Sequence, residues 1–402
     1  GNVTVKVSGD IDIAGIKDGF GSGIFSYVDP GVIGNGGNIN VTAGSFSLRD
    51  GTKLEASTSG QGNAGNIDIT TTGNLTISGT QDSTLLQQPD GVARSKINSS
   101  TFGQGNAGKI TINTGGKLSV LNKGGILSEV RDTGVGNSNG IKIDAGELEI
   151  ANRSSIQTTT KQAKLVKDKG NAGNIDIKTK GNLTISGTEN PTFLQERAGV
   201  ALSSINSSTE GQGDAGKITI DTAGKLSVLN RGGIFSAIDA TGVGNSNGIK
   251  IDAGELDIAN QSSIQTPTSQ AKLVKDKGNA GDITISTNGN LTIIGTNNSS
   301  DSGVSGINSS SVGAGDAGKV TINTQGNKLF LSNRAAIFSA IKEGVGNSKG
   351  VKIDTGDLNL TNGSAISTGN VGGLGNAGDV VITSKGKIDI VDSIGISSFN
   401  FG

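Results

Sequence analysis

Residues 105–112 read Gly105-Asn106-Ala107-Gly108-Lys109-Ile110-Thr111-Ile112. A glycine and an asparagine come first, and after three further residues two β-branched residues stand two apart. Glycine and asparagine tolerate the left-handed backbone conformations that tight corners require. Apolar residues that alternate with polar ones are typical of a strand with one buried face. The stretch therefore predicts a corner followed by a half-buried β-strand.

The same pattern recurs along the whole chain. Its corner glycines are Gly34, Gly62, Gly105, Gly136, Gly170, Gly213, Gly244, Gly278, Gly315, Gly346 and Gly375. With the matching start Gly1-Asn2-Val3 they define about twelve units, the first of them clipped. Near-copies beginning at Gly62, Gly170 and Gly278 lie 108 residues apart, so three units form a longer period. Asparagines at equivalent corners are expected to form amide ladders between units.

Each unit holds two further short strands. A second apolar pair, such as Leu75 and Ile77, follows a polar turn, and a third segment has the form Ile97-Asn98-Ser99. Three strands and three turns, repeated about twelve times, predict an all-β fold: a parallel β-helix, or β-solenoid, of about twelve three-stranded coils. We expect residues 1–402 to form a single repeat domain, with coils stacked at ~4.8 Å into a rod of roughly 58 Å.

Composition excludes several classes of protein. Lys and Arg total 34 and Asp and Glu total 35, so the net charge of −1 argues against nucleic-acid binding by phosphate neutralisation. Cysteine, histidine and methionine are absent, which excludes disulfides, thiolate or histidine catalysis and the common zinc sites. The missing initiator methionine predicts a segment of a longer chain. No apolar run of about 18 residues occurs, so no membrane span is expected.

Motifs that resemble active sites have a simpler interpretation. The pattern Gly-x-Gly-x-x-Gly occurs five times, but a strand follows it where a dinucleotide site needs a helix. Asp144, Asp252 and Asp354 occupy one equivalent place, about three coils apart, which is too far for a pair of glycosidase carboxylates. The corner residues Asp214 and Asp316 lack the nine-residue period of calcium-binding repeats. We therefore predict no enzyme activity, no catalytic residue, no cofactor and no metal site.

Insertions interrupt the regular units at two places. One class follows the second strand, at residues 79–96, 187–204 and 295–306, and the other precedes the corner, at residues 158–169 and 266–277. Insertions at one place per repeat lie on one face, often a binding face. Such a side ridge would contain Leu85, Leu86, Arg94, Phe193, Leu194 and Arg197. The competing interpretation is that its apolar residues pack on the solenoid and its charges are solvated.

Three stretches resemble the repeat region of filamentous-haemagglutinin-like exoproteins, the passengers of two-partner secretion systems, in the large form common in cyanobacteria. They are residues 23–31 (GIFSYVDPG), 34–39 (GNGGNI) and 57–67 (STSGQGNAGNI). The resemblance implies a right-handed parallel β-helix and export through an outer-membrane transporter barrel. It also implies a place outside a Gram-negative cell or on its outer surface, and a role in adhesion.

The function expected from these observations is that of a non-enzymatic stalk or adhesin segment of a large secreted or cell-surface exoprotein. Two alternatives stay open: a module that binds cell-surface or matrix glycans, and a polysaccharide-active β-helix enzyme. An enzyme should break the repetition with a cluster of carboxylates and basic residues in one groove, and no such break is apparent in the sequence. Unpaired strand edges at terminal coils also predict end-to-end self-association.

Overall fold

The computed structural model describes residues 1–18, 20–80, 94–131, 134–161, 170–188, 202–239, 242–269, 278–296 and 305–401. These residues are all-β and include no helix. Apart from one short antiparallel pair, their strands pair in parallel and form a β-solenoid of about 11 turns, which confirms the predicted fold class. The chain divides into two compact units, unit 1 (Gly1–Ser207) and unit 2 (Ser208–Gly402), and each is described by itself.

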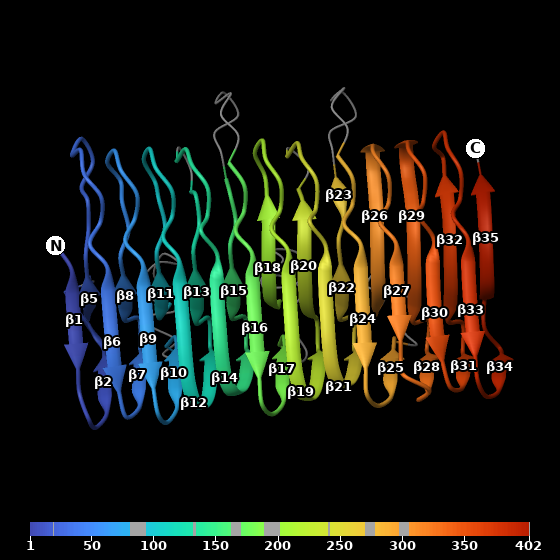
Figure 1. Ribbon diagram of the computed structural model, residues 1–402, viewed down its shortest axis with the longest axis horizontal. Coiled ribbons are helices and arrows are strands. Elements are labelled where there is room, and N and C mark those ends of the chain that lie inside the picture. The colour runs from blue at the N-terminus through green and yellow to red at the C-terminus, as the bar shows by residue number, and fades with distance from the viewer. Residues whose placement is uncertain are drawn as a thin grey trace. The chain divides into compact units, whose positions relative to one another are not determined.

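Unit 1 contains three ladders of parallel strands, one for each side of its coils (Figure 1). The first ladder is formed by β1 (Val3–Lys6), β6 (Ile39–Ala43), β9 (Ile67–Thr71), β12 (Ile110–Leu121), β14 (Ile141–Ala151) and β16 (Ile175–Thr179). The second is formed by β2 (Ile11–Ala14), β7 (Phe46–Arg49), β10 (Leu75–Ser78), the later halves of β12 and β14, and β17 (Leu183–Ser186). The third is formed by β5 (Gly23–Phe25), β8 (Lys53–Glu55), β11 (Lys96–Asn98), β13 (Gly125–Leu127), β15 (Ser155–Gln157) and the start of β18 (Ser203–Thr209).

Unit 2 repeats this arrangement. Its first ladder contains β19 (Ile218–Leu229), β21 (Ile249–Ala259), β24 (Ile283–Thr287), β27 (Val320–Asn323), β30 (Val351–Thr355) and β33 (Val380–Ser384). The second contains the later halves of β19 and β21, with β25 (Leu291–Ile294), β28 (Leu329–Ser332), β31 (Leu358–Thr361) and β34 (Ile388–Val391). The third contains β20 (Gly232–Ile238), β22 (Ser263–Gln265), β23 (Thr268–Ser269), β26 (Gly306–Ala314), β29 (Ala336–Val345), β32 (Ala365–Val371) and β35 (Gly395–Phe401).

Stacked aliphatic side chains form the core of each unit. In unit 1, Ile110 pairs with Ile67 on one side and with Ile141 on the other, and all three side chains are buried. Burial alternates along each strand, as in the buried–exposed–buried–exposed–buried pattern of β9. Full burial of one such side chain stabilises the fold by about 1.5–3 kcal/mol. The predicted Ile and Val pairs therefore form the core of the first ladder. The pair Val380 and Ile382 in β33 of unit 2 is half-buried.

The corner glycines are required by their backbone geometry. Gly105 has a φ of 140°, and a Cβ added there would lie 2.2 Å from the carbonyl oxygen of Gly62 in the preceding coil. A larger residue would therefore be strained and would also collide with the backbone of the preceding coil. This result confirms the predicted role of glycine at the corners.

One element departs from the parallel pattern. In unit 1, β3 (Ile16–Lys17) and β4 (Phe20–Gly21) form a short antiparallel pair between the second and third strands of the first coil. The ring of Phe20 is largely exposed there. The sequence pattern did not predict this pair, because two residues per strand are too few to show a periodicity.

Candidate functional site

Side chains on the outward face of the third ladder in unit 1 form a continuous polar cluster. They project away from the core, because they alternate with fully buried residues such as Leu54 and Ile97. Despite this direction Glu55 is only 7% exposed, Glu129 is 5% exposed and Asn98 is 0% exposed. We call this set the polar cluster; its members are Tyr27, Glu55, Ser57, Asn98, Ser100, Glu129 and Thr159.

The carboxylate of Glu55 is the first centre of the polar cluster. Its Oε2 accepts a 3.0 Å hydrogen bond from the hydroxyl of Tyr27, and its Oε1 accepts bonds of 3.1 Å from Ser57 and 2.7 Å from the amide of Asn98. Both oxygens are thus engaged by side chains of three neighbouring coils. Buried charged groups are stable only when such partners are present.

Glu129 is the second centre. Its Oε1 accepts a 2.8 Å bond from Thr159, and its Oε2 lies 3.5 Å from Nε of Arg131. Ser100 connects the two centres, because its hydroxyl donates to Asn98 at 2.6 Å and accepts from the backbone N–H of Glu129 at 3.3 Å. The guanidinium of Arg131 also lies over the ring of Phe102, 5.6 Å from its centroid.

Burial perturbs the ionisable groups beside the polar cluster. It lowers the pKa of Lys96, and the positive charges of Lys53 and Arg131 act in the same direction, while Glu55 and Glu129 oppose the shift. Burial also raises the pKa of Tyr27, aided by the charge of Glu55 and by their hydrogen bond. Perturbed pKa values mark candidate functional sites, but structural networks produce them as well.

The polar cluster is the break in the repetition that the sequence did not reveal. Glu55, Asn98 and Glu129 are separated by 43 and 31 residues, and only the strand register brings them together. Insertions of different length lie between the coils, so the sequence alone does not align these positions. A comparison of third strands could have found it, since Glu55 is level with Phe25 and Asn98 of the neighbouring coils, and Glu129 is level with Ser100 and Thr159.

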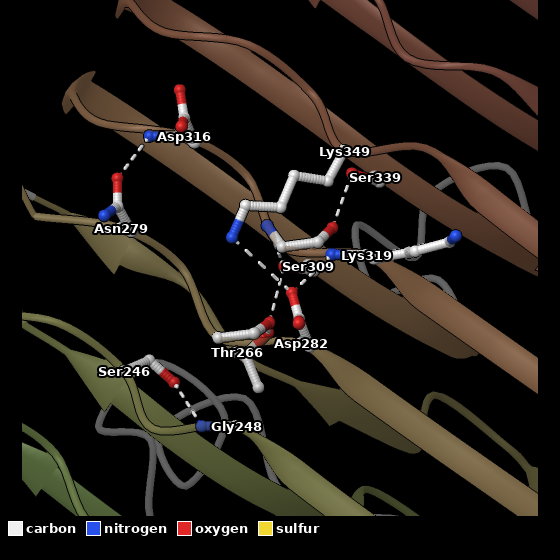
Figure 2. A network of polar contacts seen from close by, with 12 residues as sticks. Ser246, Gly248, Thr266, Asn279, Asp282, Ser309, Asp316, Lys319, Ser339 and Lys349 are labelled. Atoms are coloured by element: carbon white, nitrogen blue, oxygen red, sulfur yellow. Dashed lines mark hydrogen bonds and ion pairs between the residues drawn. The ribbon is translucent and has the colours of Figure 1, made fainter.

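A second polar network lies at the corners of unit 2 (Figure 2). The backbone N–H of Asp316 donates to Oδ1 of Asn279 at 2.8 Å, and the N–H of Lys319 donates to Oδ1 of Asp282 at 2.8 Å. The same arrangement joins Asn35, Asn63, Asn106, Asn137 and Asn171 in unit 1, and Asp214, Asn245, Asn279, Asp316, Asn347 and Asn376 in unit 2. These corner ladders therefore consist mainly of bonds from a backbone N–H to a side-chain oxygen of the preceding coil.

Buried hydroxyl groups satisfy the backbone inside these corners. Thr266 and Ser309 both donate to the carbonyl of Gly281, at 2.6 and 3.0 Å, and Ser339 donates to the carbonyl of Gly318 at 2.8 Å. An unpaired buried carbonyl would destabilise the coil by about 1–3 kcal/mol. Inward-facing Ser and Thr residues at the corners thus have a structural role.

The corner of unit 1 at Gly140 is hollow. A groove of about 490 Å³, the corner groove, is lined there by Lys109, residues 137–142, residues 171–174 and Asp176. Gly140 lies between Lys109 and Asn174, because Ile110 N–H donates to the carbonyl of Gly140 and Ile141 N–H donates to that of Asn174. A Cβ at Gly140 would lie 2.6 Å from the carbonyl oxygen of Asn174, so only glycine fits at this close approach of two coils.

The residues predicted for the side ridge are only partly described. Arg94 is half-buried and lies two residues before β11. Leu85, Leu86, Phe193, Leu194 and Arg197 lie outside the described residues. The side ridge therefore stays a prediction.

The equivalent aspartates Asp252 and Asp354 form ion pairs within their own strands, with Lys250 at 2.7 Å and with Lys352 at 3.6 Å. Both side chains are partly exposed. These contacts support the interpretation of the aspartates as solvated surface residues.

The described part of the chain offers no group of three or more acidic side chains arranged to hold a metal ion. Nor does that part contain an apolar helix of the length needed to cross a bilayer. A scan of family models, a search of curated proteins and a search of solved structures found no match for this chain.

Proposed function

We propose that the chain is a non-enzymatic stalk segment of a large exoprotein, which holds an adhesive or effector region away from the cell that secretes it. The observation that carries this proposal is the continuity of the corner ladders within each unit. Side-chain oxygens and backbone N–H groups join five consecutive corners in unit 1, from Asn35 to Asn171. Each coil is thereby fixed to its neighbours at its corner as well as along its strands.

Stiffness follows from this construction. A repeat protein is stabilised chiefly by contacts between neighbouring repeats, so each added coil extends the structure by about 4.8 Å. The corner bonds and the aliphatic stacks are the same in successive coils. The length of the structure therefore depends on the number of coils and not on the sequence of a particular coil. These are the properties that a spacer requires.

The polar cluster supports a structural role more than an enzymatic one. A general acid or base needs a carboxylate that can reach a substrate. Both carboxylates of the polar cluster are instead buried and engaged by protein donors. The proposal also includes export by two-partner secretion and adhesion at the cell surface. Both are supported by the family resemblance.

A replacement experiment in the complete exoprotein tests the stalk. Residues 62–169 hold three coils, and residues 170–277 are a near-copy of the same length. Replacing the first segment by a second copy of residues 170–277 should preserve export, folding and adhesion, because coil number is preserved. Loss of adhesion by an exported and folded replacement chain would show that the side chains of residues 62–169 carry the activity, and would overturn the proposal.

A further inference from the structure

We propose that Lys53 and Lys96 of unit 1 bind the phosphate group of a phosphorylated sugar, and that the ring of this sugar packs against Phe25. We call these three side chains the lysine site. They lie on the outward face of the third ladder, in its consecutive strands β5, β8 and β11 (Figure 1). This inference goes beyond the stalk, since a spacer needs no ligand.

Two lysines stand side by side in the lysine site. Lys53 of β8 is in register with Lys96 of β11. Both side chains project outward, because the next residues along the strands, Leu54 and Ile97, are fully buried in the core. Neighbouring strands are about 4.8 Å apart, and like charges placed directly opposite each other destabilise a sheet. The pair therefore has a cost that its position in the fold does not explain.

The rest of the third ladder carries no charge at this position. In every other described coil the equivalent residue is glycine, serine or alanine. These residues are Gly23, Gly125, Ser155 and Ser204 in unit 1, and Gly233, Ser263, Gly306, Ala336, Ala365 and Gly395 in unit 2. The two lysines thus interrupt the repetition, and an unfavourable local feature of this kind is expected at a functional site.

Neither lysine ammonium forms a hydrogen bond or an ion pair with the residues that the structure describes. Burial and the positive charges of Lys53 and Arg131 lower the pKa of Lys96, while Glu55 and Glu129 oppose the shift. Both carboxylates already accept hydrogen bonds from other side chains of the polar cluster. The two ammonium groups therefore lack a direct anionic partner, which a ligand can supply.

A phosphate monoester suits this pair better than a carboxylate does. It carries a charge of about −1.5 to −2 at pH 7 and three acceptor oxygens, so it can accept hydrogen bonds from two ammonium groups at once. Lysine is also a common phosphate-binding residue in proteins. Since a carboxylate brings only one negative charge, the lysine pair favours phosphate.

Phe25 provides an apolar surface beside the lysines. Its ring extends over Gly23, where a Cβ would lie 2.7 Å from Cζ of the ring. Because Gly23 is in register with Lys53, the ring lies one coil away from that lysine. The ring is 38% exposed and stacks on Tyr27, with 5.4 Å between the ring centroids. The C–H groups of a sugar can pack on the negative face of such a ring, which places the sugar next to its bound phosphate.

Calorimetric titration of the whole chain with glucose 6-phosphate tests the proposal, with glucose and glucuronate as the neutral and the carboxylate controls. We expect glucose 6-phosphate to bind at least tenfold more tightly than glucose and at least threefold more tightly than glucuronate. The double variant Lys53→Gln/Lys96→Gln should weaken this binding at least tenfold. The matched control Lys142→Gln, which removes an exposed lysine of the first ladder, should leave it within twofold.

A second variant separates the sugar from the phosphate. Phe25→Ala should weaken the binding of glucose 6-phosphate at least threefold and leave the binding of inorganic phosphate within twofold, because only the sugar contacts the ring. Bound glucose 6-phosphate should also protect Lys53 and Lys96, but not Lys142, from acetylation by an amine reagent, as measured by mass spectrometry of the digested chain.

Several results would overturn the proposal: no binding of glucose 6-phosphate, equal binding of glucuronate, unchanged affinity of the double variant, or an affinity for glucose 6-phosphate that Phe25→Ala does not change. If the double variant misfolds, Lys96→Gln alone is tested, since removal of a half-buried ammonium should not destabilise the fold at neutral pH. An unchanged affinity of that variant has the same meaning. Binding of a soluble sugar is measured here, whereas the replacement of residues 62–169 tests the stalk through adhesion.

Discussion

Asn106 and Asn137 occupy the same corner of consecutive coils, and Oδ1 of Asn106 accepts a 2.8 Å hydrogen bond from the backbone N–H of Asn137. Oδ1 of Asn137 in turn accepts from the N–H of Asn171 at 2.9 Å. A side chain of one coil thus completes the backbone hydrogen bonding of the next. The bond needs an acceptor oxygen at this position but no donor, which explains why Asp214 and Asp316 occupy equivalent corners.

Substitution of Asn106 tests this requirement. Asn106→Ala removes the acceptor of the Asn137 N–H and should lower the free energy of unfolding by about 1 kcal/mol. Asn106→Asp keeps the oxygen and should lower it by less than half of that amount. Denaturant unfolding measures both. Equal losses in the two variants would show that the acceptor oxygen is not what the corner needs.

The corner glycines should tolerate no side chain. Gly105→Ala places a Cβ about 2.2 Å from the carbonyl of Gly62 at a φ of 140°, so we expect a loss of about 2–4 kcal/mol in unfolding free energy. Gly9→Ala is the matched control, because a Cβ there meets nothing within 4 Å, and its effect should stay within about 0.5 kcal/mol. Similar thermal midpoints for the two variants would contradict the account of the corner.

The polar cluster should depend on its central carboxylate. Glu55→Ala leaves the donors of Tyr27, Ser57 and Asn98 without their acceptor. A buried donor left without its acceptor costs about 1–3 kcal/mol, so the variant should lose at least about 2 kcal/mol of unfolding free energy. The exposed Glu147 provides a control, since Glu147→Ala should change it by no more than about 0.5 kcal/mol. A loss below 1 kcal/mol for Glu55→Ala, on the order of one ordinary hydrogen bond, would refute a stabilising role for the cluster.

The lowered pKa of Lys96 predicts a pH dependence of stability. A buried ammonium whose folded pKa lies below its unfolded value of about 10.4 destabilises the fold at neutral pH. This destabilisation fades as pH rises through the folded pKa toward the unfolded one. Compared with Lys96→Gln, the parent chain should therefore gain unfolding free energy between pH 7 and about 10.4. A difference between the two chains that stays constant or moves the other way in denaturant titrations would contradict the direction of the shift.

The regular part of the fold could be predicted because its signals are local. Ile110 and Ile112 show a strand in three residues, and Gly105 shows the corner before it. The turn at Asn122 was missed, although its φ of 52° and the bond that it accepts from Asn152 are repeated in other coils. Hydrogen bonds between side-chain amides of successive coils were expected at the corners, but they occur chiefly at these turns.

The polar cluster and the corner groove could not be predicted from local patterns. Glu55 and Asn98 meet because β8 and β11 are paired, although 43 residues separate them. The corner groove depends on Gly140 lying between Lys109 and Asn174, which requires the register of three coils. Both features are created by stacking. The handedness of the solenoid, implied by the family resemblance, stays a prediction.

Hydrogen exchange in the variant Ile251→Asp tests most directly whether the coils support one another. Ile251 is fully buried in β21, between Ile220 of β19 and Ile285 of β24. A carboxylate at this position should raise amide exchange in β19 and β24 as well as in β21, whereas Ile251→Val should leave all three strands protected. Faster exchange confined to β21, or unchanged protection throughout, would contradict a fold in which each coil is stable only between its neighbours.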